Sequence, residues 1–443
     1  MNAREVALLT VRDVFVAPGG GTERGAQEAL DYRARKANLA PRDRAFATEL
    51  AYGAIKMRRA LDWYLEPLIG ERRTQLPPVI HEILRLAVYE LVYTRADTHA
   101  TVFEFVNLAK RYGHRGVANL VNAVLRSFLR DRRPEPARDM FENDDDYLGT
   151  RYSLPTWLVR QWRAVFGERA EAICAAVNDP AATCVTINAL RTSPGEVIEQ
   201  FGAEGITATP SPFVPESLLV NNAAGVHAQE ALAGGTWWLQ SESSAMPVGV
   251  LNPQPGEAIL DVCSGRGNKA LQIGARMGGE GTLLAIEREA RKAQVLEARL
   301  EAAGVAAGIV IGDATTPLLP AEQRFDRVLI DAPCSGVGVV ERHPEARWKK
   351  QPGDGERLAL TQRALLEALA PSIHVGGAVV YAVCSTDPRE TVEVVEWFRS
   401  RANFERGLIP AAFEPFITDA GDVLVPPGLN GRDGFFIARL EHR

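Results

Sequence analysis

The stretch Ala258-Ile-Leu-Asp-Val-Cys-Ser-Gly-Arg-Gly-Asn-Lys269 joins a short apolar run to a glycine-rich turn and then to a helical segment at residues 270–277. A strand, a glycine turn and a helix in this order are typical of the ligand-binding edge of a doubly wound α/β domain. Gly265 and Gly267 with Ala270 also fit the loose dinucleotide pattern. The turn alone is compatible with an adenosyl cofactor, with NAD or with a plain tight turn.

Similar units repeat downstream of this turn. Apolar runs occur at residues 281–286, 309–311, 327–330 and 378–383, with helical stretches between them. Such runs predict parallel strands covered on both faces. Val423–Val425 and Gly434–Leu440 are separated by turn residues and predict a closing antiparallel hairpin. We therefore expect a Rossmann-like α/β domain over residues 241–443.

The N-terminal part has a different pattern. Residues 4–130 carry apolar side chains at helical spacing, which predicts an all-α domain over residues 1–133. Breaks between its helices are expected at Pro18–Gly21, Pro41, Pro77-Pro78 and Gly113. The net charge of this domain is about +7, against about −13 for the rest of the chain. A positive charge of this size is expected both for a domain that binds a polyanion and for an ordinary solvent-exposed helical surface, and it favours neither.

A third module is expected between these two. Arg132–Pro136 reads as a linker, and residues 134–240 then mix helical and strand-like segments. The expected helices are 157–166, 170–177 and 194–201, and the expected strands are 184–188 and 218–220. This mixture predicts a small α+β module.

The composition excludes several classes of protein. No run of about eighteen apolar residues occurs, and the first residues do not resemble a signal peptide, so no membrane span is expected. Five cysteines without paired spacing favour a reducing compartment, and the seven histidines show no zinc-ligand spacing. We expect a soluble cytoplasmic monomer with no membrane partner and no metal site.

Acidic residues follow three successive predicted strands. Glu287 follows the second strand, Asp313 the third and Asp331 the fourth. Because the carboxyl ends of parallel strands meet at one edge of a sheet, these carboxylates are expected to face one crevice. One suits ribose, another the adenine amino group, and the third lies near the reacting group. Any one of them alone could be a helix N-cap, but three in register favour a cofactor site.

Two cysteines follow adjacent predicted strands. Cys334 lies in Asp331-Ala-Pro-Cys-Ser-Gly336, and Cys384 lies in Tyr381-Ala-Val-Cys-Ser385. Thiolates at such positions are suited to covalent catalysis. The other cysteines, Cys174, Cys184 and Cys263, are read as small buried side chains.

These motifs resemble the Nol/Nop/Sun family of RNA 5-methylcytosine methyltransferases, and most closely its bacterial RsmB type. The matching stretches in family order are Asp331–Gly336, Arg342–Glu345 with Trp348, Tyr381–Ser385 and Gly431–Phe436. Upstream, the stretches that resemble the NusB-like helical domain of the RsmB type are Asp43-Arg44 with Tyr52-Gly53, Ile83–Leu91 and Val121–Arg126. The resemblance therefore covers nearly the whole chain.

The resemblance implies methyl transfer from S-adenosylmethionine to C5 of a cytosine in 16S small-subunit ribosomal RNA. It makes Cys384 the nucleophile that adds to C6 of the base, and it makes Cys334 the residue that assists product release. Thiolate addition turns C5 into an enamine-like carbon that accepts the methyl group. Asp331 could hydrogen-bond the N3/N4 edge, and Lys269 joins these catalytic candidates. A helix hides C5 and C6, so the target cytosine must be single-stranded or extruded.

The expected cofactor site combines the glycine-rich loop with the strand-end acids: Cys263, Ser264, Gly265, Arg266, Gly267, Asn268, Lys269, Glu287, Asp313 and Asp331. The family loop usually reads Cys-Ala-Ala-Pro-Gly-Gly-Lys, so Arg266 and Asn268 are departures. Asparagine tolerates positive φ less freely than glycine, which puts the affinity for the cofactor in doubt. Val383 replaces the usual threonine before the nucleophile, and activity is expected to survive that change.

A basic cluster with an interleaved tryptophan follows the Pro-Cys loop: Arg342, His343, Arg347, Trp348, Lys349 and Lys350. Phosphate contact and base stacking would suit it, and a solvated loop is the alternative. Two other classes remain open for the chain as a whole. A non-catalytic RNA-binding protein or assembly factor is disfavoured by the two intact cysteines, and an NAD-dependent oxidoreductase would bind nicotinamide at the same loop.

Overall fold

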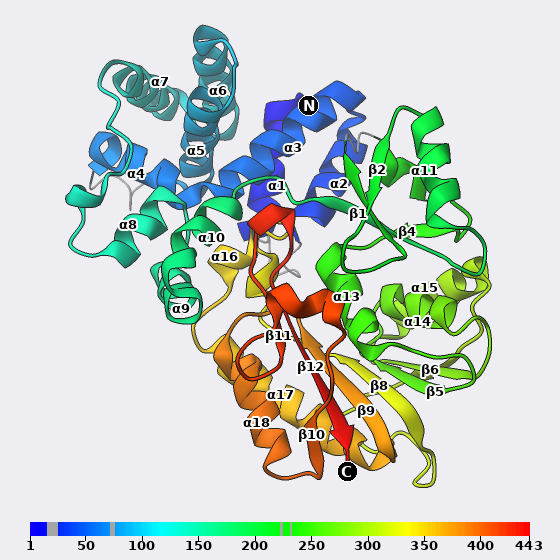
Figure 1. Cartoon of the computed structure of the whole chain (residues 1–443). Coiled ribbons are helices and arrows are strands. Elements are labelled where there is room, and N and C mark those ends of the chain that lie inside the picture. The colour runs from blue at the N-terminus through cyan, green and yellow to red at the C-terminus, as the bar shows by residue number, and fades with distance from the viewer. Residues whose placement is uncertain (16–24, 71–75, 222–224, 231–232) are drawn as a thin grey trace. The chain divides into compact units, whose positions relative to one another are not determined.

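The structure of the chain is a computed structural model that describes residues 1–15, 25–70, 76–221, 225–230 and 233–443 (Figure 1). These residues form two compact units. The first unit contains Met1–Asn178 and Val340–Lys350, and the second contains Asp179–Val339 and Gln351–Arg443. The break expected at Pro18–Gly21 lies outside the described residues. No helix in the described ranges is both long and apolar enough to span a bilayer.

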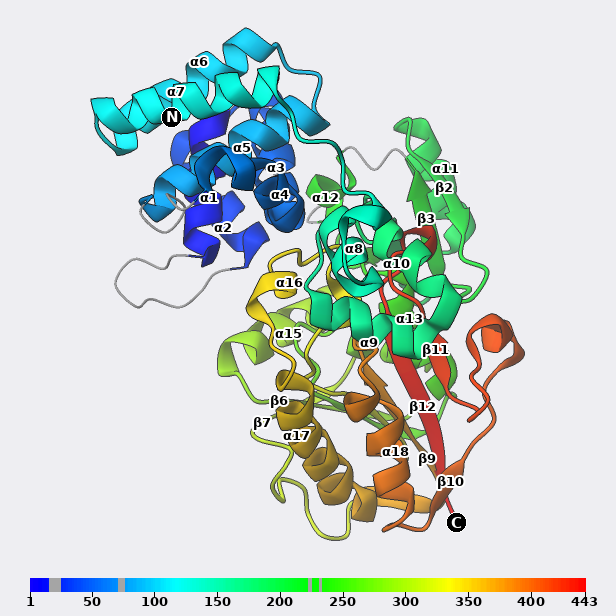
Figure 2. The same ribbon diagram turned by 90° about the vertical axis from the view of Figure 1, so that its left-hand side faces the viewer.

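The first unit begins with a helical domain, as the apolar spacing predicted. Its helices are α1 (Ala3–Phe15), α2 (Ala26–Ala37), α3 (Pro41–Lys56), α4 (Arg58–Ile69), α5 (Pro78–Tyr93), α6 (Thr98–Tyr112) and α7 (Arg115–Arg130). Proline opens α3 and α5, at a position where its missing N–H has no intrahelical partner to lose. Helix α5 is buried along most of its length and contributes to the main core of the domain. Helices α6 and α7 lie side by side on that domain (Figure 2).

Three further helices complete the first unit: α8 (Asp144–Arg151), α9 (Thr156–Phe166) and α10 (Ala170–Ala176). The sequence placed them with the small α+β module, whereas the structure groups them with the helical domain. One reason is Arg59 of α4, which donates hydrogen bonds to Thr150 Oγ1 (3.1 Å) and to the carbonyl of Leu154 (2.8 Å). Such long-range bonds leave no local sequence pattern, so the boundary could not be read from the sequence.

The second unit begins with a four-stranded antiparallel sheet in the order β2-β3-β1-β4. Its elements are β1 (Thr183–Ile187), α11 (Pro194–Ala203), β2 (Thr207–Pro210), β3 (Ser217–Asn221), α12 (Val226–Gln229) and β4 (Trp237–Leu239). Phe201 packs edge-on against Trp237 in the core of this module. The predicted strands correspond to β1 and β3, whereas β2 and β4 are too short to show a periodic pattern.

The remainder of the second unit is built on an eight-stranded sheet. Its main path runs β10-β12-β9-β8-β5-β6-β7, and β11 pairs with β12. The strands are β5 (Ala258–Val262), β6 (Thr282–Glu287), β7 (Gly308–Ile311), β8 (Phe325–Asp331), β9 (Ile373–Val383), β10 (Phe404–Arg406), β11 (Val423–Val425) and β12 (Phe435–His442). Strands β5 to β9 pair in parallel, and β11 and β12 form the predicted antiparallel hairpin.

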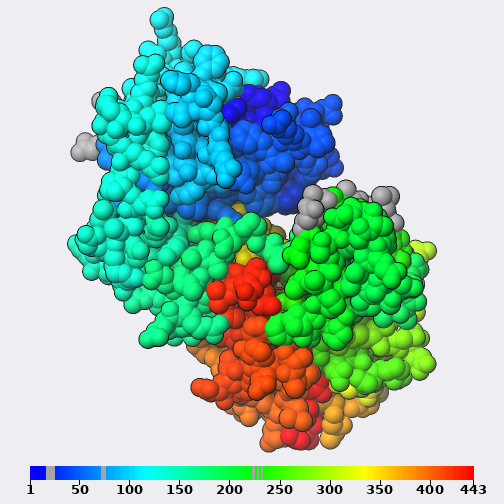
Figure 3. All heavy atoms as spheres, turned by 45° about the horizontal axis from the view of Figure 1, so that its top comes forward, coloured from blue at the N-terminus to red at the C-terminus, as the bar shows by residue number. Residues whose placement is uncertain are grey.

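Helices cover both faces of this sheet. One face packs against α13 (Glu242–Leu251), α14 (Asn268–Arg276) and α15 (Ala290–Ala303). The other face packs against α17 (Asp354–Leu369) and α18 (Val392–Arg399). The closing segment, red in Figure 3, lies beside the green part of the chain. There the carbonyl of Gly431 accepts a hydrogen bond from the N–H of Ala182 (3.0 Å), next to β1 of the small sheet.

The chain order places the ligand-binding edge of the sheet. After β5, β6 and β7 extend the sheet to one side, and the chain then crosses back to place β8 and β9 on the other side of β5. The strand order therefore reverses between β5 and β8. Open α/β sheets bind ligands at such a reversal, beyond the carboxyl ends of the strands. The glycine-rich turn and both cysteine turns lie at this edge.

Candidate active site

In the glycine-rich turn, Cys263 is the one residue other than glycine that has a positive φ angle. Positive φ angles fall on Cys263 (61°), Gly265 (59°) and Gly267 (90°). A side chain on Gly267 would place its Cβ 2.4 Å from Leu296 Cδ1, so glycine is required there. Asn268 is the first residue of α14 and does not have a positive φ. The departure at residue 268 therefore does not strain the loop, contrary to the expectation from sequence.

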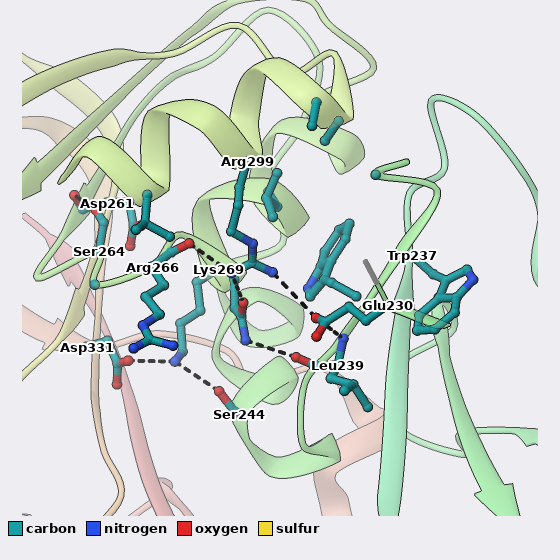
Figure 4. A pocket seen from close by; sticks show the side chains of 18 of the residues that line it. Glu230, Trp237, Leu239, Ser244, Asp261, Ser264, Arg266, Lys269, Arg299 and Asp331 are labelled. Atoms are coloured by element: carbon teal, nitrogen blue, oxygen red, sulfur yellow. Dashed lines mark hydrogen bonds and ion pairs between the residues drawn. The ribbon is translucent and has the colours of Figure 1, made fainter. Parts of the chain in front are cut away.

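Asn268 instead supplies contacts that a glycine could not make. Its Nδ2 donates to the carbonyl of Leu239 in β4 (3.1 Å), and its Oδ1 accepts from Arg299 in α15 (2.6 Å; Figure 4). Arg299 also donates to the carbonyl of Arg266 (2.9 Å) and lies 3.9 Å from Glu230. This network joins the turn to α15 and to the small sheet. Nothing in the sequence signalled Arg299 or Glu230, because both become neighbours of the turn only through folding.

The turn forms one wall of a cavity of about 770 Å³ (Figure 4). Trp237, Trp238 and Leu239 of β4 line the cavity together with Ser264, Gly265, Arg266 and Lys269 of the turn. The side chain of Arg266 is exposed on the cavity wall. This volume lies within the range of small-molecule and cofactor sites.

Lys269 and Asp331 meet in this cavity. Lys269 Nζ lies 2.6 Å from Asp331 Oδ2 and 3.1 Å from Ser244 Oγ (Figure 4). The ammonium group is also 5.6 Å from the centre of the Phe435 ring. Lys269 is buried, whereas Asp331 keeps part of its carboxyl group accessible. Two residues predicted to be catalytic, 62 positions apart in the sequence, are thus joined in one ion pair.

Asp261 is a cavity residue that the sequence analysis did not select, although it is the last acidic residue before the turn. It has no exposed surface, and neither carboxylate oxygen has a hydrogen-bond partner in the described part of the chain. Burial raises the pKa of Asp261 to about 7, with Ser264 and Lys269 opposing the rise. A buried carboxylate without partners is suited to receive a cationic group of a ligand. S-adenosylmethionine carries an ammonium and a sulfonium group, so the residues present fit this cofactor.

A second hollow of about 220 Å³ is also lined by residues of the turn and brings the three strand-end acids together. Glu287 is buried and accepts hydrogen bonds from the N–H groups of Gly265 (2.8 Å) and Glu289 (2.8 Å). Asp313 is exposed, and its hydrogen bonds from Thr315 lower the pKa of its carboxyl group. Asp331 lines both hollows. The two spaces therefore share one wall and can hold the two ends of an extended cofactor.

The two predicted cysteines face each other at the ends of β8 and β9. Cys334 Sγ and Cys384 Sγ are 3.3 Å apart, and both side chains are half-buried. The hydrogen bond to Cys384, followed by burial, raises the pKa of Cys334 well above its usual value. The backbone holds the two turns together, because the N–H of Gly338 donates to the carbonyl of Cys384 (3.1 Å) and the carbonyl of Gly338 accepts from the N–H of Gly434 (2.7 Å).

The basic cluster lies in a different part of the structure. Residues 340–350 belong to the first unit, whereas both cysteines belong to the second. Arg347 is 1% exposed and donates to the carbonyl of Val177 (2.7 Å) and to Asn178 Oδ1 (2.7 Å). Trp348 Nε1 donates to the carbonyl of Ile55 (2.6 Å), and its ring packs on the helical core. These two side chains anchor the segment within the protein, so the expected RNA contact by them is not supported.

The other members of the cluster have accessible side chains. His343 is exposed, and Arg342, Lys349 and Lys350 are half-buried. Burial lowers the pKa of Arg347 to about 9.

The described residues contain no group of three or more His, Cys, Asp or Glu placed to hold a metal ion.

Comparison with known proteins divides the chain into the three parts that the sequence predicted: a helical domain, a small module and an α/β domain. Three family profiles match the chain: NusB over residues 1–130, a ferredoxin-like domain of the RsmF/B-like methyltransferases over residues 154–227, and 16S rRNA methyltransferase RsmB/F over residues 248–441. The probable ribosomal RNA small subunit methyltransferase B of Synechocystis sp. is 32% identical over 451 residues, covering 100% of this chain and 99% of that protein. The protein of the same name from Bacillus subtilis is 32% identical over 419 residues, covering 91% and 92%.

Solved structures agree at the level of the fold. The crystal structure of PH0851 superposes with a TM-score of 0.82 at 22% identity, covering 100% of this chain and 99% of that protein. The structure of NSun6 from Pyrococcus horikoshii with SFG has a TM-score of 0.57 at 20% identity and covers 65% of this chain and 98% of that one.

A Rossmann-like sheet, a glycine-rich turn with acids at the next strand ends and a cation-accepting cavity define a methyltransferase that uses S-adenosylmethionine. The predicted cofactor and fold class are thus confirmed. The chain belongs to the RsmB/F family of methyltransferases and carries that family's NusB-like N-terminal domain. This membership confirms the resemblance found in the sequence and argues against the NAD-dependent oxidoreductase.

Proposed function

We propose that the chain transfers a methyl group from S-adenosylmethionine to C5 of a cytosine in small-subunit ribosomal RNA, through a covalent adduct between Cys384 and C6. The observation that carries the proposal is the 3.3 Å spacing of Cys334 Sγ and Cys384 Sγ at the ends of adjacent strands. The names of the relatives point to ribosomal RNA of the small subunit as the substrate.

The raised pKa of Cys334 supports the assignment of the nucleophile. Cys334 keeps its proton at neutral pH, and its sulfur is within hydrogen-bond distance of Cys384. Cys384 is the sulfur that adds to C6 of the base in this proposal. The electron pair released by this addition makes C5 nucleophilic toward the methyl group that S-adenosylmethionine supplies.

Lys269 and Asp331 support the same step. Addition of a thiolate to C6 moves negative charge toward the N3 edge of the ring, so a proton donor or a cation near that edge favours the addition. The ammonium group of Lys269 lies 2.6 Å from Asp331, which leaves part of the carboxyl group free for the base. Asp331 then accepts a hydrogen bond from the N4 amino group, and Lys269, which holds it in place, is the cation near that edge.

The two sulfurs also provide a route for release of the product. The first cause of the high pKa of Cys334 is its hydrogen bond to Cys384. Once Cys384 has become a thioether, it carries no charge, and this cause is weakened. Cys334 can then give its proton to water, and the resulting thiolate removes the C5 proton of the methylated ring. The C5 electron pair re-forms the C5–C6 double bond and expels Cys384 as a thiolate.

The helical domain is proposed to contact the RNA backbone. Helix α7 carries Arg115, Asn119, Arg126 and Arg130 on exposed positions at helical spacing, and it contains no acidic residue. Arginine and asparagine side chains of this kind suit phosphate contact. His343, with the accessible lysines Lys349 and Lys350, could add to this contact. The RNA is expected to present a single-stranded or extruded cytosine to a cytoplasmic monomer.

The test is transfer of labelled methyl from S-adenosylmethionine to unmodified small-subunit RNA, followed by nucleoside analysis. We expect 5-methylcytosine with the unaltered chain and none with Cys384→Ala, while S-adenosylhomocysteine binds both with similar affinity. A labelled base other than 5-methylcytosine would contradict the proposal. If the chain binds the cofactor but transfers no methyl group to naked RNA or to assembling subunits, a non-catalytic role is favoured.

A further inference from the structure

A single buried carboxylate lies next to the two cysteine turns. Glu390 closes the short 3-10 turn Pro388–Glu390 and has no exposed surface. Its Oε1 accepts from the N–H of Ser335 (2.8 Å) and from Gln362 Nε2 (3.1 Å). Its Oε2 accepts from the hydroxyl groups of Ser385 (2.6 Å) and Ser335. Four donors saturate a carboxylate, which is the condition under which its charge can be buried.

The two serines directly follow the two cysteines. Ser335 follows Cys334, and Ser385 follows Cys384. The serines are 50 positions apart in the sequence, yet their hydroxyl oxygens are 3.1 Å apart and share one oxygen of Glu390. The carboxylate therefore links the two turns side chain to side chain. A change in this link would alter the spacing of the two sulfurs.

Glu390 is itself held from two sides. Gln362 of α17 donates both to Glu390 and to the carbonyl of Pro333 (3.0 Å), the residue before Cys334. The hydroxyl group of Tyr381 in β9 donates to the backbone carbonyl of Glu390 (2.6 Å). Helix α17 and strand β9 thus fix the position of the carboxylate relative to both cysteines.

We propose that Glu390 is a positioning residue that holds Cys334 and Cys384 at the spacing their covalent chemistry needs. The inference rests on the roles proposed for the two cysteines. Glu390 is not among the residues lining either cavity beside the cofactor turn, so it acts through Ser335 and Ser385. The pKa of Cys334 is raised mainly by its hydrogen bond to Cys384 and by burial. The negative charge of Glu390 raises it further. Glu390 therefore influences both the distance and the protonation of the sulfur pair.

The informative variant is Glu390→Gln, which keeps the size of the side chain but removes its charge and replaces one acceptor oxygen by an NH₂ group. Glu90→Gln is a matched control in the first unit. Glu90 also has no exposed surface and accepts hydrogen bonds from Arg4 (2.8 Å) and Thr101 (2.5 Å). Both variants lose a buried carboxylate that accepts several hydrogen bonds, but only Glu390 touches the cysteine turns.

The first readout needs neither RNA nor cofactor. Dibromobimane reacts with thiolates, and mass spectrometry separates the product bridged between two sulfurs from the product in which each sulfur is labelled alone. In the full chain, Glu390→Gln should lower the bridged fraction and move the pH midpoint of the Cys334 reaction downward. The double variant Ser335→Ala/Ser385→Ala keeps the charge. It should lower the bridged fraction and leave the pH midpoint unchanged.

The second readout is methyl transfer. Misplacement of reacting groups by about 1 Å costs about 10²-fold in rate, so kcat of Glu390→Gln should fall by about 10- to 10²-fold. The affinity for S-adenosylhomocysteine should stay within about twofold, because Glu390 lines neither cavity beside the cofactor turn. Glu90→Gln should lower thermal stability without either effect.

The outcomes separate this inference from the proposed function. If Glu390→Gln bridges its cysteines as fully as Glu90→Gln, with the same pH midpoint, the positioning role is refuted, whether or not the chain methylates cytosine. If bridging falls as expected but the unaltered chain makes no 5-methylcytosine, the positioning role stands and the proposed function fails. A variant that loses only stability, with bridging intact, would make Glu390 a purely structural residue.

Discussion

Replacing Asp261 with asparagine tests what the buried carboxylate beside the cofactor turn does. Burial raises the pKa of Asp261 from 3.8 to about 7. Between these two values the folded chain binds more protons at this group than the unfolded chain does. The free energy of unfolding therefore falls as the pH rises toward 7, and the full penalty is present above 7.

The size of the effect follows from the shift. About three pKa units at about 1.4 kcal/mol each correspond to about 4 kcal/mol, and local relaxation around the charge reduces the expected penalty to about 2–4 kcal/mol. Asparagine has nearly the same shape and no charge. The Asp261→Asn chain should therefore be more stable than the unaltered chain by about this amount at pH 8, with little difference near pH 4.

The gain in stability should come with a loss of cofactor binding. Ionised Asp261 is expected to face the cationic groups of the cofactor, so S-adenosylhomocysteine should bind the unaltered chain more tightly as the pH rises through 7. Binding to Asp261→Asn should be weaker and independent of pH over this interval.

Urea unfolding and titration calorimetry at pH 5, 6.5 and 8 measure both quantities. Asp139→Asn, an exposed carboxylate of the first unit, is the control and should change neither. Equal stability of Asp261→Asn and the unaltered chain across this range, with equal cofactor affinity, would refute the reasoning. It would mean that the carboxyl group has partners in solution that satisfy its charge.

Three further variants test other parts of the structure. Cys334→Ala should trap the RNA adduct of Cys384, visible as a slowly migrating band on a denaturing gel, because release rather than attack is impaired; absence of the band would contradict the assigned roles. Gly338→Ala would place a Cβ 2.1 Å from the carbonyl oxygen of Gly434, so methyl transfer should fall by about 10²-fold at unchanged cofactor affinity. Trp348→Phe removes the 2.6 Å hydrogen bond to Ile55 and should lower the free energy of unfolding by about 1 kcal/mol. Equal urea midpoints for Trp348→Phe and the unaltered chain would show that this anchor contributes nothing.

Much of the second unit could be predicted because its strands are continuous apolar runs between turn residues. The predicted run at residues 378–383 is the end of β9, and Val423–Val425 is β11. Strands β2, β4 and β10, each of three or four residues, were missed, although β7 and β11 are as short and were predicted. Strands that short form because a neighbouring strand offers hydrogen bonds, and this information lies elsewhere in the chain.

The site shows the same division. Cys334, Cys384 and the strand-end acids could be found because parallel strands bring their carboxyl ends to one edge. The burial of Arg347 and the packing of Trp348 were not foreseen, because the sequence shows that a side chain is charged or aromatic but not what it packs against. Arg347 donates to the carbonyl of Val177, directly after α10, and Trp348 packs against the helical core.

The sequence by itself determined the fold class, the order of the modules, the cofactor-binding edge and the two cysteines, because hydrophobic periodicity and turn residues act locally along the chain. Only the tertiary structure decided which polar groups meet. In the described part of the folded chain, the carboxylate of Asp261 is buried without a hydrogen-bond partner. The side chain of Asn268 accepts a hydrogen bond from Arg299, and Glu390 links the two cysteine turns. The reason is physical: a buried charge is stabilised or left unsatisfied by neighbours that are distant in sequence, and only folding places them within hydrogen-bond distance.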